Sequence, residues 1–325
     1  MLNLKEKNIK IFIAGHKGLV GSSVLRILKK KYINILVREK KDLNLLDKNK
    51  LDVFIKKNKF DLVIMCAAKA GGILANSNAP VDFLYYNLEI QNNVISSCYK
   101  NNVKNFIFLG SSCIYPDNFK SSIKESDLLS AKLEKTNEAY AIAKIAGLKM
   151  CEYISLEKDY NYKSIMPCNL YGYNDLYNKE KSHVIPSMFL KFHEAKMDGS
   201  NKVILWGNGE PLREFLFVDD LANSILYLIN NWKKFIDLDI PFINIGFGKD
   251  ITIKELAEKI KKITEYKGKI IYDTSKPNGT YKKLLNCEKI NNFGWQPETS
   301  LDEGLSKTYN WFLKNIDNYR SEFSN

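Results

Sequence analysis

The chain begins with a pattern that few folds accommodate: a buried strand, a glycine-rich turn and a helix in direct succession. Residues 9–14 are apolar apart from Lys10. Gly15, Gly18 and Gly21 follow at three-residue spacing, and apolar residues then recur at helical spacing over residues 22–31. Glycines at these points permit a tight turn, and the free N–H groups at the start of the helix bind a pyrophosphate. The sequence therefore predicts a dinucleotide site beside a parallel sheet.

Strands and helices continue to alternate after this turn. Residues 33–37, 61–68 and 106–109 are short apolar runs typical of buried strands, and residues 80–100 are typical of a helix. Strand–helix–strand units of this kind are right-handed and build a parallel sheet with helices on both faces. We therefore predict an α/β protein with a Rossmann-type, doubly wound sheet, whose ligands lie outside the carboxyl ends of the strands.

A serine, a tyrosine and a lysine fit one chemical site at that edge of the sheet. Ser111 follows a strand directly, and Tyr140 and Lys144 lie one turn apart on an Ala-rich helix. An ammonium near a phenol favours the phenolate, so we expect Lys144 to lower the pKa of Tyr140 and make it a proton donor near neutral pH. Tyr-x-x-x-Lys alone is a chance pattern in this chain, but the strand-end serine and the upstream glycine turn favour the functional interpretation.

The residues after the second strand indicate which nicotinamide cofactor fits. An acid there holds the ribose 2′-hydroxyl of NAD, whereas basic residues accept the 2′-phosphate of NADP. Glu39 keeps NAD open, but Arg38, Lys40 and Lys17 bring positive charge to the same place. We therefore expect NADP(H) as the cofactor. For each of these residues taken singly, the alternative is that it only forms part of a solvated charged turn.

The net charge of +12 raises the question of nucleic-acid binding. The 49 Lys and Arg residues are scattered along the chain, and only four of them are arginine, so we expect no nucleic-acid partner. No apolar run approaches the roughly 20 residues of a membrane span, and the first ten residues show no secretory signal. Six cysteines without C-x-x-C or metal-ligand spacing predict free thiols, no metal and a cytoplasmic protein without a membrane partner.

These motifs make the chain resemble the extended short-chain dehydrogenase/reductase family over nearly its whole length. The resemblance rests on Gly15-x-x-Gly18-x-x-Gly21, Ser111, Tyr140-x-x-x-Lys144 and the later Arg213-Glu214-Phe215-x-x-Val218-Asp219-Asp220. It implies an NADP-binding Rossmann domain over residues 1–178, a mainly substrate-binding lobe over residues 179–325, and a homodimer formed through helices of the cofactor domain. We expect a segment near 214–250 to return to the Rossmann domain; from the residues themselves, 242–246 are typical of a strand that returns to the sheet and 253–263 of a helix of the lobe.

The resemblance also implies an activity: epimerisation on both sides of a 4-keto group in a GDP-sugar, and NADPH-dependent reduction of that group. Tyr140 would donate the proton with Lys144 as its partner, Ser111 would bind the carbonyl, and Cys113 and His183 would be the base and acid of epimerisation. The cofactor-binding residues that it implies are Gly15, His16, Lys17, Gly18, Leu19, Val20, Gly21, Arg38, Lys40, Leu109, Gly110, Ser111, Ser112, Lys144, Pro167, Cys168, Asn169, Leu170 and His183.

Four residues of the second half match positions that hold the nucleotide sugar in the family: Lys191, Trp206, Arg213 and Asn278. The fork of Arg213 suits a diphosphate and Trp206 offers a stacking face for a base; a surface ion pair and a core aromatic are the alternatives. Family members commonly have arginine at the positions of Lys17 and Lys191, and the lysines keep the charge without the bidentate geometry. The alternative function is a same-fold epimerase or reductase for another nucleotide sugar, such as a GDP-heptose.

Overall fold

A six-stranded parallel sheet forms the centre of the protein, as the alternating pattern predicts. The computed structural model describes residues 4–117, 121–178, 181–276 and 278–322, with side chains described up to residue 316. The strand order is β2-β1-β3-β4-β5-β9, and each neighbouring pair is parallel. The strands are β1 (Ile11–Ala14), β2 (Ile35–Leu36), β3 (Leu62–Met65), β4 (Asn105–Leu109), β5 (Asn161–Pro167) and β9 (Phe242–Ile245). The predicted return of residues 242–246 to this sheet is confirmed by β9.

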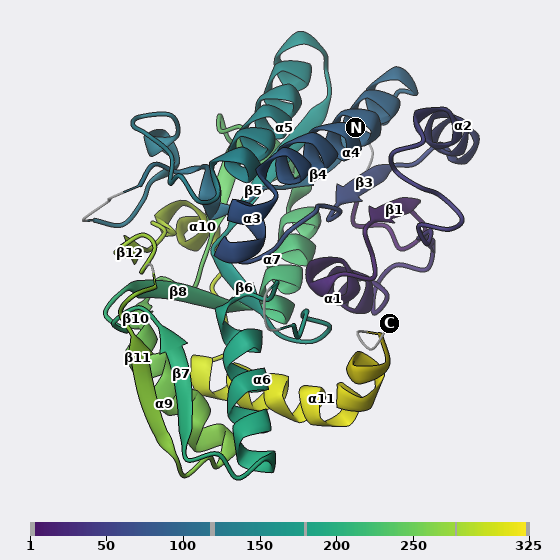
Figure 1. The fold of residues 1–325 in the computed structure, drawn as a ribbon. Coiled ribbons are helices and arrows are strands. Elements are labelled where there is room, and N and C mark those ends of the chain that lie inside the picture. Colours follow the sequence, from purple (N-terminus) through teal and green to yellow (C-terminus); the bar gives the residue numbers. More distant parts are fainter. Residues whose placement is uncertain (1–3, 118–120, 179–180, 277, 323–325) are drawn as a thin grey trace.

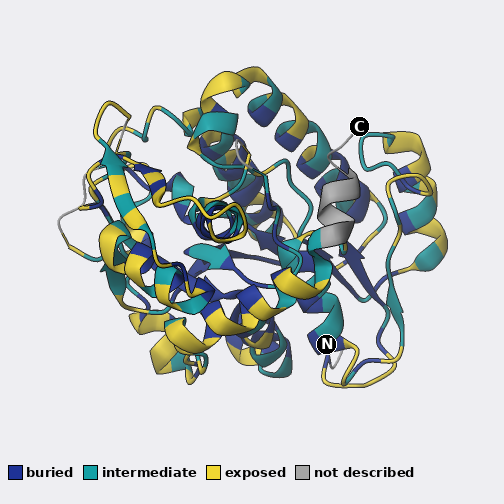
Figure 2. Ribbon diagram, turned by 60° about the horizontal axis from the view of Figure 1, so that its bottom comes forward, coloured by how far each residue is buried: buried dark blue, intermediate teal, exposed yellow. Residues whose placement is uncertain are grey.

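Helices cover both faces of the sheet (Figure 1). One face carries α1 (Leu19–Leu28) and α7 (Val218–Asn230), and the other carries α2 (Lys48–Asn58), α4 (Pro80–Lys100) and α5 (Glu138–Glu157). Because both faces are covered, β1, β3 and β4 are buried along their whole length and show no polar alternation. Figure 2 shows these strands in dark blue between helices whose outward faces are yellow. Shorter helices are α3 (Ile73–Asn78), α8 (Trp232–Ile236) and α10 (Glu288–Phe293).

A smaller lobe from the second half of the chain lies below the sheet in Figure 1. Its strands form two small sheets, ordered β10-β8-β12 with β6 beside β8, and β11-β7. The elements are β6 (Asn169–Tyr171), β7 (Lys202–Trp206), β8 (Leu212–Phe217), β10 (Asp250–Thr252), β11 (Lys269–Asp273), β12 (Lys282–Lys283), α6 (Val184–Met197), α9 (Ile253–Thr264) and α11 (Leu301–Glu322). The predicted helix over residues 253–263 is confirmed by α9, which begins with a capping box between Thr252 and Glu255.

Each of these two parts has its own hydrophobic core. The first surrounds the central sheet and includes Leu221 and Ile225 of α7, so α7 packs with the sheet although it follows lobe segments in the sequence. The second is rich in aromatic side chains, with Phe192 and Phe312 fully buried between α6, α9 and α11. Full burial of each such side chain contributes about 1.5–3 kcal/mol relative to exposure. The segment from β12 to α10 also returns to the first core, through Ile290 among others.

All six cysteines are free, as predicted. Four are buried, and desolvation raises the pKa of each of their thiols: Cys98, Cys151, Cys168 and Cys287. Cys66 and Cys113 are partly exposed. Across the part of the chain that the structure describes, no helix has the length and apolar character to cross a membrane.

Candidate active site

The glycine turn between β1 and α1 is packed too closely for side chains. Gly15 has φ +87°, and a Cβ there would lie 2.7 Å from the backbone of Ala67, at the end of β3. A Cβ on Gly21 would lie 2.1 Å from the carbonyl oxygen of Gly15. Among the described residues no side chain caps α1, so its first N–H groups remain available to an anion. This cradle, where β1 lies between β2 and β3, fits the pyrophosphate of a dinucleotide.

Glu39, the acid after β2, is held by two lysines. Its carboxylate lies 2.8 Å from Lys17 Nζ and 3.5 Å from Lys41 Nζ, and the contact with Lys17 lowers the pKa of Glu39. Arg38 and Lys40 are exposed beside this trio. The sequence anticipates the cations but not that Lys41 shares Glu39 with Lys17. An acid with two cationic partners is a poor acceptor for the 2′-hydroxyl of NAD, and the surplus positive charge suits a 2′-phosphate.

Three of the predicted catalytic residues come together at the end of β4. The hydroxyl of Tyr140, in the first turn of α5, hydrogen-bonds with the side chain of Ser111. The same Ser111 Oγ accepts a hydrogen bond of 3.2 Å from the backbone N–H of Cys113. Cys113 itself lies in the short 3₁₀ turn Ser112–Ile114. A serine hydroxyl, a phenol and a thiol therefore share one small volume.

The ionisation of Tyr140 differs from the expectation. Lys144 is buried, and its Nζ donates a hydrogen bond of 2.8 Å to the carbonyl oxygen of Leu109 and lies 5.8 Å from the centre of the Tyr140 ring. Desolvation raises the pKa of Tyr140, Cys113 adds to the rise, and the bond with Ser111 opposes it. Desolvation also lowers the pKa of Lys144 to about 8. The expected lowering of the Tyr140 pKa is therefore wrong in this structure, because loss of water outweighs the neighbouring ammonium.

His183 lies directly before α6, and its backbone carbonyl accepts a hydrogen bond of 3.0 Å from Ser187. The side chain is exposed to solvent, yet the surrounding protein lowers the pKa of His183 through desolvation. Tyr140 and Arg213 show the same combination of partial exposure and strong desolvation.

The four predicted nucleotide-sugar residues form a second cluster, on the lobe. Lys191 Nζ lies 6.0 Å from the centre of the Trp206 ring. The Oδ1 of Asn278 accepts a hydrogen bond of 2.8 Å from the backbone N–H two residues after Trp206. Gly279 is in turn so close to Arg213 that a Cβ on it would lie 3.2 Å from Nη2. The cluster combines a cation, an aromatic face and a guanidinium, which suits a nucleoside diphosphate.

Cys168 and Asn169, two of the predicted cofactor residues, lie where β5 passes into β6. The backbone N–H of Cys168 donates to the carbonyl oxygen of Ile245 at 3.0 Å, and the side chain of Asn169 donates to the carbonyl oxygen of Glu214 at 2.9 Å. The remaining predicted cofactor residues lie in the glycine turn and α1, at the end of β4, or in β5 and β6: His16, Gly18, Leu19, Val20, Leu109, Gly110, Ser112, Pro167 and Leu170. That they contact the cofactor stays a prediction.

Two contributors to the site were missed by sequence reasoning. Lys276 lies 5.8 Å from the centre of the Trp206 ring. Glu214 is fully buried and accepts hydrogen bonds of 2.7 and 2.9 Å from two backbone N–H groups, and burial raises the pKa of Glu214 to about 7. Glu214 thereby fixes the strand that presents Arg213. The sequence feature that could have identified Glu214 is its position in the Arg213-Glu214-Phe215 motif.

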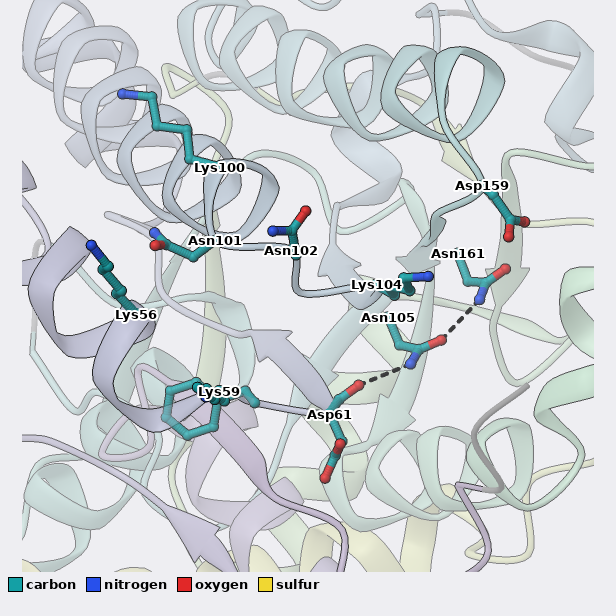
Figure 3. Close-up of a pocket in the computed structure, with 11 residues that line it drawn as sticks. Lys56, Lys59, Asp61, Lys100, Asn101, Asn102, Lys104, Asn105, Asp159 and Asn161 are labelled. Carbon is teal, nitrogen blue, oxygen red and sulfur yellow. Dashed lines mark hydrogen bonds between the residues drawn. The ribbon is translucent and has the colours of Figure 1, made fainter.

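A broad recess of about 1120 Å³ lies at the opposite edge of the sheet (Figure 3). It surrounds the amino ends of β3, β4 and β5, where Asn105 donates to the carbonyl oxygen of Asp61 and accepts from Asn161. Its lysines do not converge: Lys100 and Lys104 point in different directions in Figure 3. The candidate catalytic residues belong to the carboxyl edge, so this recess is separate from the site.

The model of a family described as "NAD dependent epimerase/dehydratase family" matches residues 11–246. The chain is 47% identical over 312 residues to a putative GDP-L-fucose synthase 2 of Arabidopsis thaliana, which covers 96% of this chain and 94% of the relative. It is 44% identical over 316 residues to a GDP-L-fucose synthase of Escherichia coli (strain K12), with 96% and 98% covered. A solved GDP-mannoheptose C4 reductase from Campylobacter jejuni with NADP bound matches with a TM-score of 0.85 at 35% identity, covering 95% of this chain and 99% of that one.

Proposed function

The chain belongs to the NAD dependent epimerase/dehydratase family, and from this premise we propose that it converts GDP-4-keto-6-deoxy-D-mannose to GDP-L-fucose with NADPH. It would act as a 3,5-epimerase and a 4-reductase. The observation that carries the proposal is the cluster at β4, where a thiol that reduction does not need, Cys113, lies beside the reductase residues Ser111 and Tyr140. The two fucose synthases named above are 47% and 44% identical to the chain and the heptose reductase is 35% identical, which favours the deoxymannose derivative over a GDP-heptose.

The cofactor is NADP(H), and the residues present fit it. The cradle at Gly15 and Gly21 leaves room only for backbone, as a pyrophosphate site requires. Lys17 and Lys41 pair with Glu39, and Arg38 adds a further exposed cation in the same turn, where the 2′-phosphate would lie. When bound, NADPH supplies the hydride for C4.

Epimerisation uses the acidity that the 4-keto group gives to the protons on C3 and C5. Cys113, as the thiolate, removes one of these protons, and the C–H electron pair passes into an enolate. His183, as the imidazolium, delivers a proton to the opposite face of the same carbon, which inverts its configuration. Desolvation lowers the pKa of His183, and a lower pKa makes the protonated ring the stronger acid. The exchange occurs once at each carbon, and between the two rounds Cys113 gives up its proton to solvent while His183 takes one up from solvent.

Reduction uses the other members of the cluster. Ser111 donates a hydrogen bond to the 4-oxygen, and Tyr140 delivers a proton to it as C4 is reduced. A phenol with an ordinary pKa is already neutral at neutral pH, and desolvation raises the pKa of Tyr140 further, so its O–H is present to be donated. Lys144, buried beneath the Tyr140 ring, is placed to hold the ribose and to stabilise the phenolate left after proton transfer.

The proposal is tested by incubating the protein with NADPH and GDP-4-keto-6-deoxy-D-mannose in D₂O and analysing the product by NMR. We expect GDP-L-fucose with deuterium at C3 and C5. Cys113→Ser keeps the shape but removes the acidic thiol, so it should suppress deuterium uptake while reduction to an unepimerised product continues. Fully deuterated, fully epimerised product from Cys113→Ser at the wild-type rate would show that Cys113 is a packing residue. Faster turnover of a GDP-4-keto-heptose would contradict the substrate assignment.

We also propose how the chain is organised around this reaction. Residues 1–178 would bind the cofactor and residues 179–325 mainly the substrate, with 214–250 returning to the first domain; residue 179 itself lies outside the described residues. The six free thiols support a cytoplasmic location. A homodimer through α4 and α5 is supported by large apolar side chains exposed on these neighbouring helices: Val81, Tyr85, Tyr86, Ile142, Tyr153 and Leu156.

A further inference from the structure

We propose that Gly72 is a positioning residue for His183, because the backbone at Gly72 sets where the segment carrying His183 lies. The inference rests on the proposed function, in which His183 is the acid of epimerisation. Gly72 belongs to the loop after β3, and His183 lies directly before α6, so the two are brought together only by the fold.

The contact is between two backbones. The N–H of Gly72 donates a hydrogen bond of 3.1 Å to the carbonyl oxygen of Lys181. A Cβ on Gly72 would lie 2.5 Å from the carbonyl oxygen of Ser182, the residue before His183. Even close carbon–oxygen contacts in proteins are about 3.3–3.6 Å, so an alanine would drive the two backbones apart by about 1 Å.

Side-chain hydrogen bonds hold the backbones at Gly72 and Ser182 in place, so a small local shift of either backbone does not relieve the clash. The buried Asn76 donates hydrogen bonds of 2.8 and 3.0 Å to the carbonyl oxygens of Gly71 and Gly72. On the other side, the hydroxyl of Ser182 donates 2.6 Å to the carbonyl oxygen of Leu176. His183 follows the displaced residue directly, so the separation between its imidazole and the end of β3 has to change.

Gly71 offers a matched control. A Cβ on Gly71 would meet side chains, Ala75 at 3.0 Å and Phe83 at 3.1 Å, while the carbonyl oxygen of Lys181 would be at an ordinary 3.6 Å. Gly71→Ala therefore adds the same methyl group one residue earlier without pressing on the segment before His183.

The experiment is single-turnover reaction with GDP-4-keto-6-deoxy-D-mannose and NADPH in D₂O. For Gly72→Ala we expect deuterium uptake at C3 and C5 to slow about 10–100-fold, since misplacing a catalytic group by about 1 Å has effects of this size. NADPH oxidation should fall less, and unepimerised 4-hydroxy product should accumulate. Gly71→Ala should keep the wild-type fraction of epimerised product.

A double variant shows whether Gly72 acts through His183. His183→Asn slows deuterium uptake by itself, and Gly72→Ala should add almost nothing in that background, because the position of an absent imidazole has no effect. A further tenfold fall in Gly72→Ala/His183→Asn would overturn the proposal, as would wild-type product from a folded Gly72→Ala.

If Gly72→Ala does not fold, Asn76→Ser removes the donor that holds Gly72 without adding a clash. It should shift the product in the same direction by a few-fold, and an unchanged product ratio would overturn the proposal. Failure of the proposed function is distinct, because wild-type protein would then show no deuterium uptake. Likewise, wild-type uptake by His183→Asn would remove His183 from the acid role.

Discussion

Desolvation sets the proton chemistry of Tyr140 and Lys144 in opposite directions, so that the phenol stays neutral while the ammonium becomes easier to deprotonate. A neutral phenol is the form that a proton donor needs. The hydrogen bond with Ser111 places that O–H where a carbonyl oxygen held by the serine would lie. At the scale of single residues, burial rather than ion pairing thus sets the direction of both pKa shifts.

Tyr140→Phe tests this assignment because it removes the O–H and preserves the edge contact with Phe83, whose ring centre is 6.5 Å away. We expect reduction at C4 to slow about 10²–10⁴-fold, the usual loss for a general acid. Binding of the GDP-sugar should persist, since Lys191, Trp206 and Arg213 lie on the lobe. Stopped-flow NADPH oxidation and calorimetric titration measure the two quantities. Near wild-type reduction would mean that another group donates the proton.

Lys144 makes stability depend on pH. Its pKa falls from an ordinary 10.5 to about 8 in the folded protein, so between these values the unfolded chain binds a proton that the folded chain lacks. The free energy of unfolding should therefore rise with pH from about 8 to 10.5, by about 3 kcal/mol from this group. Urea denaturation across this range should show a smaller rise for Lys144→Met than for wild type. Replacing the exposed Lys56 by Met is the control, and parallel curves for wild type and Lys144→Met would contradict the assignment.

At the scale of elements, periodic segments are predicted well and contacts through space are not. The predicted helix over residues 80–100 has the bounds of α4, because a proline at its start and a long amphipathic pattern mark it. The predicted strand over residues 33–37 shortens to β2 (Ile35–Leu36), an edge strand with one neighbour, β1. Sequence spacing places Ser111, Tyr140 and Lys144 at one edge of the sheet. It carries no information on desolvation, so it does not predict the direction of the Tyr140 pKa shift.

At this scale, the contact between Lys17 of the glycine turn and Glu39 of the turn after β2 can be tested. Lys17→Ala removes a charge-assisted contact of 2.8 Å and leaves Glu39 with Lys41 alone, at 3.5 Å. We expect NADPH to bind about 10-fold more weakly and NADH almost unchanged, since a hydrogen bond to a charged group contributes about 1.5–3 kcal/mol. Fluorescence titration at moderate salt measures both affinities, with Lys56→Ala as the control. Equal losses of affinity for NADPH and NADH would show that Lys17 does not bind the 2′-phosphate.

At the scale of the whole molecule, the residues of the proposed site come from two parts of the fold. Ser111, Tyr140 and Lys144 come from the sheet and its helices, whereas Lys191 and Trp206 come from the lobe. The chain crosses between these parts several times, at β6, α7 and α10, and buried groups such as Glu214 tie the crossings together. Because the chain crosses several times, the relative positions of the proposed substrate-binding and catalytic side chains are fixed by several connections and not by a single linker.

The proposed homodimer is the prediction that belongs to this scale. One exposed apolar side chain needs no explanation, but α4 and α5 carry six large ones, among them Leu156 at 76% and Val81 at 75% exposure. The proposed occupant of this surface is a second copy of the chain. Leu156→Glu would place a charge in the interface, where burying it without a partner is costly. Sedimentation velocity should show a dimer for wild type and a shift toward monomer for Leu156→Glu.

Met197→Glu, at a 66% exposed position on α6, is the matched control and should leave the dimer intact. The monomeric variant should retain turnover within a few-fold, because α5 presents Lys144 to the interior of its own subunit while Leu156 faces outward, and the assigned catalytic residues come from one chain. A wild-type monomer, or a Leu156→Glu variant that remains dimeric, would place the interface elsewhere. Loss of all activity together with the dimer would instead mean that the second copy helps to shape the site, through the helix that carries both Tyr140 and Lys144.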